Sequence, residues 1–192
     1  MPLYKTVTIQ MEETGTELNI DLITKTRTDI TNDITRLEQE IISDLMKIGQ
    51  VQQWVVARAL TNYPPKKRGH YGKRVEAQLD NLIDRDGGEA FLKSGDPSDL
   101  NEQDKIAISL DLLKEKEGAF INISSKQQLS EMCFKYMKIK PISQTRKGTD
   151  QFDDDFIEHI HKSHAWAAKL RDYNKLNKIR SAYVDRFLDG NE

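Results

Sequence analysis

Apolar residues recur at helical spacing in two long stretches of the chain, from about Asp21 to Gly49 and from Lys169 to Val184. In the first stretch the aliphatic residues recur at steps of four and three: Ile30, Ile34, Leu37, Ile41, Leu45 and Ile48. In the second they recur at steps of three and four: Leu170, Tyr173, Leu176, Ile179 and Tyr183. Such spacing gathers side chains on one face of an α-helix. The pattern therefore predicts two long helices, the first about 40 Å long, and each needs a partner for its apolar face.

The segment between these stretches predicts shorter elements. Val51 to Leu60 is apolar and predicts a helix, and Val75 to Ile83 predicts a second, shorter one. A basic loop, Tyr63 to Arg74, separates the two. Arg85 to Asp99 contains Gly-Gly and Asp-Pro pairs and predicts turns.

A further helix is predicted to follow, capped by Asn101 or Asp99 and ending near Lys116. At the other end of the chain, Pro2 to Met11 predicts a short apolar segment, and Glu17 to Ile20 alternates like a brief strand before the first long helix. The chain is therefore predicted to be mostly α-helical.

Composition and charge refine this interpretation. The chain has 192 residues, of which 31% are charged and 7% aromatic, a composition typical of helical proteins with much surface and a modest core. The net charge of -2 does not by itself favour nucleic acid as a ligand. Between His161 and Tyr183, however, Asp172 is the only acid beside six cations: Lys162, Lys169, Arg171, Lys175, Lys178 and Arg180. A local basic patch is therefore predicted.

Cys133 is the only cysteine and lies among apolar residues. A buried thiol is favoured over a nucleophile, and a chain without a disulfide is expected in a reducing, intracellular setting. No apolar run approaches the ~20 residues that span a bilayer, and the start of the chain does not look like a signal peptide. We therefore expect a cytoplasmic protein.

Four motifs in the C-terminal part resemble, in order and spacing, the thumb subdomain of family A (DNA polymerase I-like) DNA polymerases. They are Asn122-Ile-Ser-Ser-Lys-Gln-Gln-Leu129, Thr145-Arg-Lys-Gly148, Asp153 before Phe156-Ile-Glu158, and Tyr173-Asn-Lys-Leu-Asn-Lys-Ile-Arg-Ser-Ala-Tyr183. The resemblance covers residues 119–187. It implies a mostly α fold, an elongated antiparallel helical hairpin or bundle in which the two long helices pack against each other.

The resemblance divides the chain into three parts. Residues 1–50 would form an N-terminal segment and the first long thumb helix, and residues 119–192 the thumb tip and the C-terminal thumb helix. Residues 51–118 form an insertion of short helices and loops where the resemblance lapses. Thioredoxin-dependent phage polymerases carry an insertion at a similar position, which implies a processivity factor as a candidate partner. Pro64 to Arg74 is then a candidate contact for DNA or a partner protein, and otherwise a solvated linker tip.

The residues of the first motif offer an anion site on their own chemistry, because unpaired N–H groups at a helix start lie beside hydroxyls and a lysine. The resemblance implies contacts with the backbone of duplex DNA from Asn122, Ser124, Ser125 and Lys126, from Thr145 and Lys147 at the thumb tip, and from Asn174, Lys178 and Ser181 on the last helix. Ser124 replaces a second Asn found in many members, which weakens any contact with base edges. Each motif also has a structural interpretation: Ser124 or Ser125 as a helix cap, and Thr145 to Gly148 as a disordered cationic loop.

Asp153 to Asp155 are better explained as the cap and first turn of a helix than as a metal site. The spacing of His159, His161 and His164 does not favour a zinc site. In the family, magnesium-binding aspartates lie in the palm and the nucleotide-binding helix in the fingers, and neither motif occurs in this sequence. We therefore expect a chain without catalytic residues or a cofactor of its own, inactive alone, that works with primer-template duplex and the remainder of a polymerase.

Two other hypotheses remain open at this point. The stripe from Ile30 to Ile48 also suits a coiled-coil-like interaction module that dimerises and has no nucleic-acid role. A nuclease centre at Asp153 to Asp155 is the third hypothesis.

Overall fold

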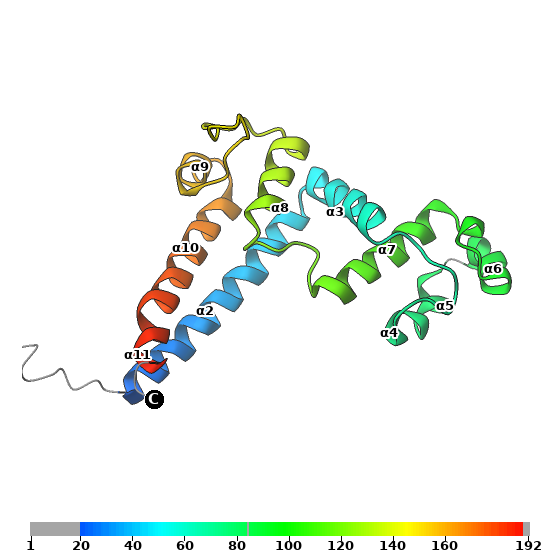
Figure 1. Ribbon diagram of the computed structural model, residues 1–192, viewed down its shortest axis with the longest axis horizontal. Coiled ribbons are helices and arrows are strands. Elements are labelled where there is room, and N and C mark those ends of the chain that lie inside the picture. The colour runs from blue at the N-terminus through cyan, green and yellow to red at the C-terminus, as the bar shows by residue number, and fades with distance from the viewer. Residues whose placement is uncertain (1–19, 84, 190–192) are drawn as a thin grey trace, which may run out of the picture. The chain divides into compact units, whose positions relative to one another are not determined.

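The computed structural model describes residues 20–83 and 85–189, so the prediction for Pro2 to Met11, and the strand prediction for Glu17 to Ile20 up to residue 19, lie outside the described residues, while Ile20 begins a helix. Figure 1 shows a chain built from helices. They are α2 (Ile20–Met46), α3 (Gly49–Asn62), α4 (Lys73–Glu76), α5 (Leu79–Leu82), α6 (Arg85–Ser94), η1 (Pro97–Asp99), α7 (Glu102–Glu117), α8 (Lys126–Ser130), η2 (Glu131–Tyr136), α9 (Asp154–Ile160), α10 (Ala165–Ile179), η3 (Arg180–Val184) and α11 (Asp185–Asp189). The prediction of a mostly α fold is confirmed.

The chain divides into two compact units, described here one at a time. The first unit contains residues 20–38 and 172–189, and the second contains residues 39–171. Both boundaries fall within helices, in α2 and α10. Among the described residues no helix is long and apolar enough to cross a membrane.

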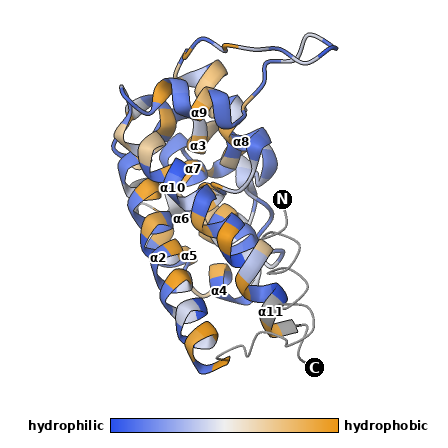
Figure 2. Cartoon of the chain, turned by 90° about the vertical axis from the view of Figure 1, so that its left-hand side faces the viewer, coloured by the Kyte–Doolittle hydropathy of each residue, from blue (hydrophilic) through white to orange (hydrophobic). Residues whose placement is uncertain are grey.

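In the first unit, the start of α2 runs antiparallel to the helical segment from Asp172 to the end of α11 (Figure 1). Ile34 and Leu37 are buried on α2, and Tyr173 and Val184 are buried on the other segment. An ion pair between Arg27 Nε and Asp185 Oδ1, 2.9 Å long, joins the two segments. The hydrophobic positions that recur along α2 appear as separate orange bands in Figure 2.

The predicted stripe of the last helix is wrong at its end, where Ile179 is 43% exposed and Tyr183 is 61% exposed. Each step of three residues falls about 60° short of a full turn, so three such steps carry Ile179 to the side opposite Leu170. The next turn, η3, is a π-helix, which takes more residues per turn than an α-helix and shifts the following side chains around the axis. Val184 is therefore buried in place of Tyr183.

The dimerisation hypothesis requires an exposed apolar face on α2, and the central positions of that face are buried. Ile34 and Leu37 are covered within the first unit, and Ile41 and Leu45 are fully buried within the second. The stripe of α2 therefore finds its apolar partners inside the chain. A second copy would have to displace them.

In the second unit, residues 63–112 build a hydrophobic core of their own. Helices α4 to α7 and the loops between them contribute its buried side chains: Val75, Leu79, Ile83, Phe91, Leu100, Ile108 and Leu112. Tyr63 and Tyr71 pack against this core from the basic loop. Asn101 caps α7, as predicted, with its Oδ1 accepting a hydrogen bond from the Asp104 N–H at 2.8 Å.

Two predictions for this region are wrong. The single helix predicted for Val75 to Ile83 is two one-turn helices, α4 and α5, and the predicted turns of Arg85 to Asp99 are largely the helix α6. Gly88 lies within α6, where a Cβ atom would overlap the Ile83 side chain. The glycine thus permits close packing of a helix and does not interrupt one.

The remainder of the second unit packs around aromatic rings. Phe134 lies edge-on to Phe156, with ring centroids 5.0 Å apart, and Phe152 lies 5.2 Å from Phe156. Cys133 is fully buried beside them in sequence, and burial raises the pKa of its thiol to about 12. The prediction of a buried thiol is confirmed.

A charged cluster joins α2 to α10 within the second unit. Lys169 Nζ lies 2.8 Å from Asp44 Oδ2 and 3.0 Å from Glu40 Oε2, and Lys47 Nζ lies 2.9 Å from Asp44 Oδ1. The hydrogen bonds from Lys169 and then Lys47 lower the pKa of Asp44 below its ordinary 3.8. The same contacts raise the pKa of Lys169, with Asp44 the larger cause.

Replacement of Gly88 by alanine is expected to destabilise the chain by about 1–3 kcal/mol, because the added methyl group collides with Ile83. Gly49→Ala is the matched control: no atom lies within 4 Å of the corresponding position. The control is expected to be neutral or to stabilise by up to ~1 kcal/mol. Urea unfolding followed by circular dichroism measures both. Equal stability of the two variants would contradict the close approach of α6 to Ile83.

The Asp44 cluster predicts a dependence of stability on pH. The folded chain holds the pKa of Asp44 below its unfolded value, so the carboxylate stabilises the fold fully above that value and loses this contribution as the pH falls through the folded-state pKa. Between pH 7 and about pH 3, the native chain is expected to lose more stability than Asp44→Asn in urea unfolding. Asp29→Asn, which changes an exposed carboxylate on the same helix, should keep the native profile. If Asp44→Asn also keeps it, the cluster makes no contribution.

Candidate nucleic-acid interface

The loop that carries the first motif is fixed by burial and by hydrogen bonds. Helix α7 ends at Gly118, which has a φ of 75° and donates its N–H to Lys114 O. The next residues alternate: Ile121 and Ile123 are buried, and Asn122 between them is exposed. Asn122 Oδ1 accepts the Ser124 N–H at 3.0 Å, and the Asn122 N–H donates to Gln128 Oε1 at 3.0 Å. The loop therefore presents Asn122 in a set orientation.

Ser125 is the N-cap of α8, since its Oγ accepts the Gln128 N–H at 3.4 Å. This confirms one of the two caps that the sequence left open. Ser125 is half-buried, while Ser124 and Lys126 on either side of it are exposed. The hydroxyl of Ser125 thus has a structural role, which is compatible with a phosphate contact at the neighbouring positions.

The second motif, Thr145 to Gly148, forms a closed turn. The Gly148 N–H donates to Thr145 O and the Thr145 N–H donates to Thr149 O, both at 2.8 Å. Gln144 and Asp150 pair as an antiparallel bridge below the turn. Gly148, with a φ of 75°, takes the left-handed conformation that this kind of hairpin turn requires. The interpretation as a disordered loop is therefore wrong, and Arg146 and Lys147 stand exposed at the tip.

The two motifs meet at one hollow of about 490 Å³ in the second unit. Its lining includes residues of α8 and η2 on one side and of the hairpin on the other: Lys126, Gln127, Ser130, Glu131, Phe134, Lys135, Thr145, Thr149, Asp150, Gln151 and Phe152. Lys126 and Thr145, predicted from separate motifs, are therefore brought together. A neighbouring hollow of about 410 Å³ is lined by Ser125 and by residues of α3, including Trp54 and Arg58.

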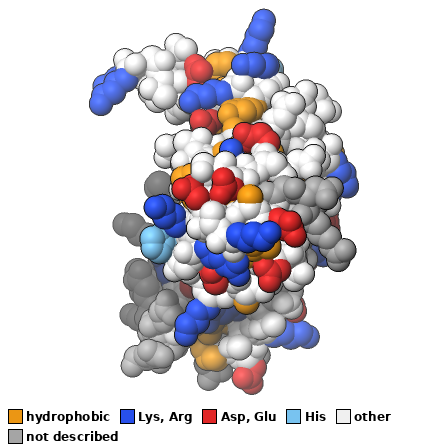
Figure 3. All heavy atoms as spheres, turned by 90° about the vertical axis from the view of Figure 1, so that its right-hand side faces the viewer, with side chains coloured by type: hydrophobic (Ala, Val, Ile, Leu, Met, Phe, Trp, Pro, Cys, Tyr) orange, Lys and Arg blue, Asp and Glu red, His pale blue; other side chains and the backbone are white. Residues whose placement is uncertain are grey.

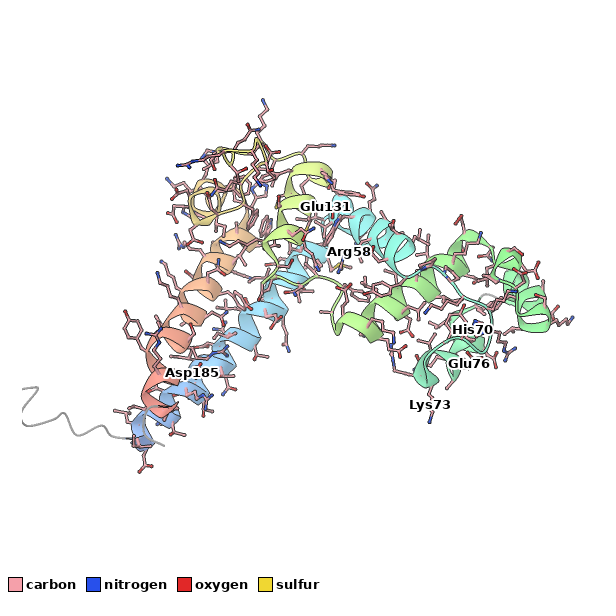
Figure 4. The ribbon with its side chains drawn as sticks, viewed as in Figure 1. Arg58, His70, Lys73, Glu76, Glu131 and Asp185 are labelled. Atoms are coloured by element: carbon pink, nitrogen blue, oxygen red, sulfur yellow. The ribbon has the colours of Figure 1, made fainter. Side chains whose placement is uncertain are left out.

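Arg58 was not singled out from the sequence, yet it fixes the approach to the loop (Figure 4). Its guanidinium pairs with the Glu117 carboxylate, donates to Phe120 O at 3.2 Å and lies 5.6 Å from the centroid of the Trp54 ring. Tyr63 Oη donates to the other oxygen of Glu117 at 2.9 Å. The end of α7 and the start of the Asn122 loop are thus held to α3. No local sequence signal marks this contact, since its partners lie far apart in the chain.

The third set of predicted residues lies in the first unit. On α10, Asn174 is half-buried and Lys178 is exposed. Ser181, in η3, is exposed and donates its hydroxyl to Asn177 O at 2.9 Å. Its oxygen still offers lone pairs to a ligand, while its proton is engaged within the helix.

The predicted basic patch is only partly available. Lys169 pairs with Glu40 and Asp44, Arg171 Nη1 lies 3.4 Å from Glu158 Oε2, and Arg180 Nε lies 3.9 Å from Asp185 Oδ2. Within residues 20–83 and 85–189, no ion pair is seen for the other three cations, Lys162, Lys175 and Lys178, and all three are exposed. Those three lysines are the part of the patch that is open to an anionic ligand.

Asp153 is a helix cap, as predicted: its Oδ1 accepts the Phe156 N–H at 2.8 Å at the start of α9. Asp154 and Asp155 fill the first turn, where the helix dipole favours acids. Across the described residues, no three or more His, Cys, Asp or Glu side chains gather as a metal site would need.

Comparison with known proteins finds similarity over the C-terminal part of the chain. Residues 101–191 match the model of DNA polymerase family A. The chain is similar to the protein named DNA polymerase I from Chloroflexus aurantiacus, with 27% identity over 89 residues. That similarity covers 44% of this chain and 9% of the relative. No solved structure matches significantly.

The matched residues begin at the cap of α7 and include the Asn122 loop, the Thr145 turn and the predicted contacts Asn174, Lys178 and Ser181. They extend into α7, which the sequence analysis placed in the insertion. The C-terminal part of the chain, residues 101–191, is thus similar to DNA polymerase family A.

Proposed function

We propose that the chain is the thumb of a family A DNA polymerase and holds primer-template duplex DNA through contacts with its phosphate backbone. The observation that carries the proposal is the meeting of Lys126 and Thr145 at one hollow, with Lys147 at the tip of the adjacent turn. Within the described residues no ion pair neutralises Lys126 or Lys147, and both are exposed. One of these cations, Lys126, lines the hollow, and the other lies in the turn that contributes Thr145 to the lining.

The contacts would position the duplex without reading its sequence. Lys126, Lys147 and Lys178 neutralise phosphates, while Asn122 and the hydroxyls of Ser124 and Thr145 add hydrogen bonds at set positions. Asn174, Ser125 and Ser181 stay in the proposal as flanking contacts. Because phosphates are alike along the duplex, the same contacts can form again after it moves by one base pair.

On this proposal the chemistry is supplied by the rest of a polymerase. Magnesium and the incoming nucleotide would bind to other subdomains, and the chain alone would not polymerise DNA. The setting would be the cytoplasm of a bacterial or phage-infected cell. A processivity factor at residues 51–118 stays a candidate partner on the resemblance to phage-type polymerases.

The Lys126 and Lys147 pair can be tested by the salt dependence of binding. Lys126→Ala/Lys147→Ala is expected to weaken binding of a short blunt duplex and to reduce the slope of log K against log salt concentration by about 1.8, because each lost phosphate contact releases ~0.9 fewer counterions. Fluorescence anisotropy over a range of salt concentrations measures the slope. Lys93→Ala/Lys116→Ala removes the same charge from exposed positions outside the interface and should leave the slope unchanged. An equal decrease in both variants would show that only net charge matters.

Lys178 is tested separately, because it belongs to the other unit. Lys178→Ala is expected to lower the salt slope by ~0.9, as one phosphate contact is lost. Lys25→Ala, which changes an exposed lysine on α2 in the same unit, is the control. If Lys178→Ala retains the native affinity and slope, the α10 face takes no part in holding DNA.

A further inference from the structure

The loop between α3 and α4 has the densest positive charge of residues 51–118. From Tyr63 to Val75 the chain contains no acid, and it contains five cations and a histidine: Lys66, Lys67, Arg68, His70, Lys73 and Arg74. All six side chains are exposed. We call residues 63–74 the insertion loop. It lies outside the part of the chain that matches the polymerase family.

The insertion loop is not a mobile tip, because hydrogen bonds fix it at several points. Tyr71 Oη accepts the Lys66 N–H at 2.9 Å and donates to Lys66 O at 2.5 Å, while its ring packs on the core. The Arg68 N–H donates to Gly95 O at 3.0 Å, and Arg68 Nη1 donates to Leu92 O at 2.8 Å. The Gly69 N–H donates to Glu76 Oε1 at 3.2 Å. The backbone of the loop is therefore tied down at several points, and little further backbone freedom would be lost on binding.

Several of the described acids lie near the insertion loop, and two of them pair with its arginines. Arg68 Nε lies 3.8 Å from Glu76 Oε1, and Arg74 Nη2 lies 3.2 Å from Asp111 Oδ1. Glu115 lies against Gly72, Glu117 accepts a hydrogen bond from Tyr63, and Asp96 lies near Lys67. Glu76 and Asp111 thus hold the two arginines of the loop in place.

The lysines of the insertion loop are left to solvent. Over the described ranges no ion pair is seen for Lys66, Lys67 or Lys73, and Figure 4 shows Lys73 projecting from α4 away from the ribbon. Lys67 is near enough to Asp96 to contribute to its lowered pKa, although hydrogen bonds from Ser98 are the larger cause. Figure 3, which views the molecule from the right-hand side of Figure 1, shows blue cationic and red acidic side chains interspersed on this face.

The chemistry of the loop favours a phosphate backbone over a protein partner. Protein interfaces depend on aromatic or other large anchors that enter pockets. Among the described residues of the insertion loop no large hydrophobic side chain is exposed, and the Tyr71 hydroxyl is already engaged. Lysines without apolar anchors suit a ligand whose binding free energy comes from counterion release.

We infer that the insertion loop is a second, sequence-independent contact for the phosphate backbone of DNA, made by Lys66, Lys67 and Lys73. It is separate from the contacts proposed for the Asn122 loop and the Thr145 turn. The lysines act as point charges on a rigid support, so the site has no preference for a base sequence.

The test uses the full chain and a short blunt duplex. Lys66→Ala/Lys73→Ala is expected to lower the salt slope by about 1.8, and Lys93→Ala/Lys116→Ala, the matched control with the same loss of charge, should leave it unchanged. Repeating the measurement in the Lys126→Ala/Lys147→Ala background separates the two contacts. If Lys66→Ala/Lys73→Ala lowers the salt slope by the same amount in both backgrounds, the site is independent. If it lowers the slope in neither background, the inference is overturned, whether or not Lys126→Ala/Lys147→Ala changes DNA binding.

A second measurement locates the contact. Cys133 is buried, so a cysteine introduced as Lys67→Cys can be labelled selectively with a photoactivatable cross-linker. Irradiation is expected to give adducts with DNA from position 67 and none from the control Lys93→Cys. Equal adducts from both positions, or none from position 67, would overturn the inference. A third result would also overturn it. If the native chain binds poly-glutamate, and Lys66→Ala/Lys73→Ala loses this binding but keeps native DNA binding, the partner is an acidic protein.

Discussion

A nearly buried guanidinium constrains the second unit. The side chain of Arg58 is only 10% exposed, and a charge removed from water must be matched by an opposite charge and by hydrogen bonds. Its partners are the Glu117 carboxylate at the end of α7, the Phe120 carbonyl in the next loop and the Trp54 ring on α3. Three segments are thereby fixed around one side chain. The orientation of the Asn122 loop follows from this arrangement, because the loop begins two residues after Phe120.

Sequence patterns were informative where the cause of structure is local. The step of three and four residues along α2 identified Ile34, Leu37, Ile41 and Leu45, all of which are buried, since that spacing holds a single helical face. Helix caps could also be predicted: the side chains of Asn101, Ser125 and Asp153 each accept a hydrogen bond from a backbone N–H in the first turn of the helix that they cap. Patterns failed where the cause is distant. Gly88 predicts a turn from the sequence alone, whereas in the structure it lies within α6 and its lack of a side chain permits the close approach of Ile83.

The candidate interface also combines features with a local cause, which the sequence predicts, and features with a distant cause, which it does not. The motifs identified Lys126 and Thr145, but their meeting at one hollow depends on how the hairpin folds back on η2. The predicted cationic patch was overestimated, because Lys169 is neutralised by Glu40 and Asp44, which precede it by more than 120 residues. A sequence cannot separate a cation that holds two helices together from one that faces a ligand. Arg58 was missed for the same reason.

Most arginines differ in their contacts from the lysines that are proposed to bind DNA. Most described arginines pair with an acid: Arg27, Arg36, Arg58, Arg68, Arg74, Arg171 and Arg180. The lysines proposed to bind DNA, including Lys126, Lys147 and Lys178, have no such pair within the described residues. A planar guanidinium fixes geometry through paired hydrogen bonds, whereas an ammonium on a flexible stem is a point charge. A surface that must release a duplex and hold it again is better built from lysines, because point charges keep their attraction as the phosphates move past. A chain of nearly zero net charge can still present unpaired lysines to a ligand, because most of its described arginines, and also Lys47, Lys135 and Lys169, pair with acids.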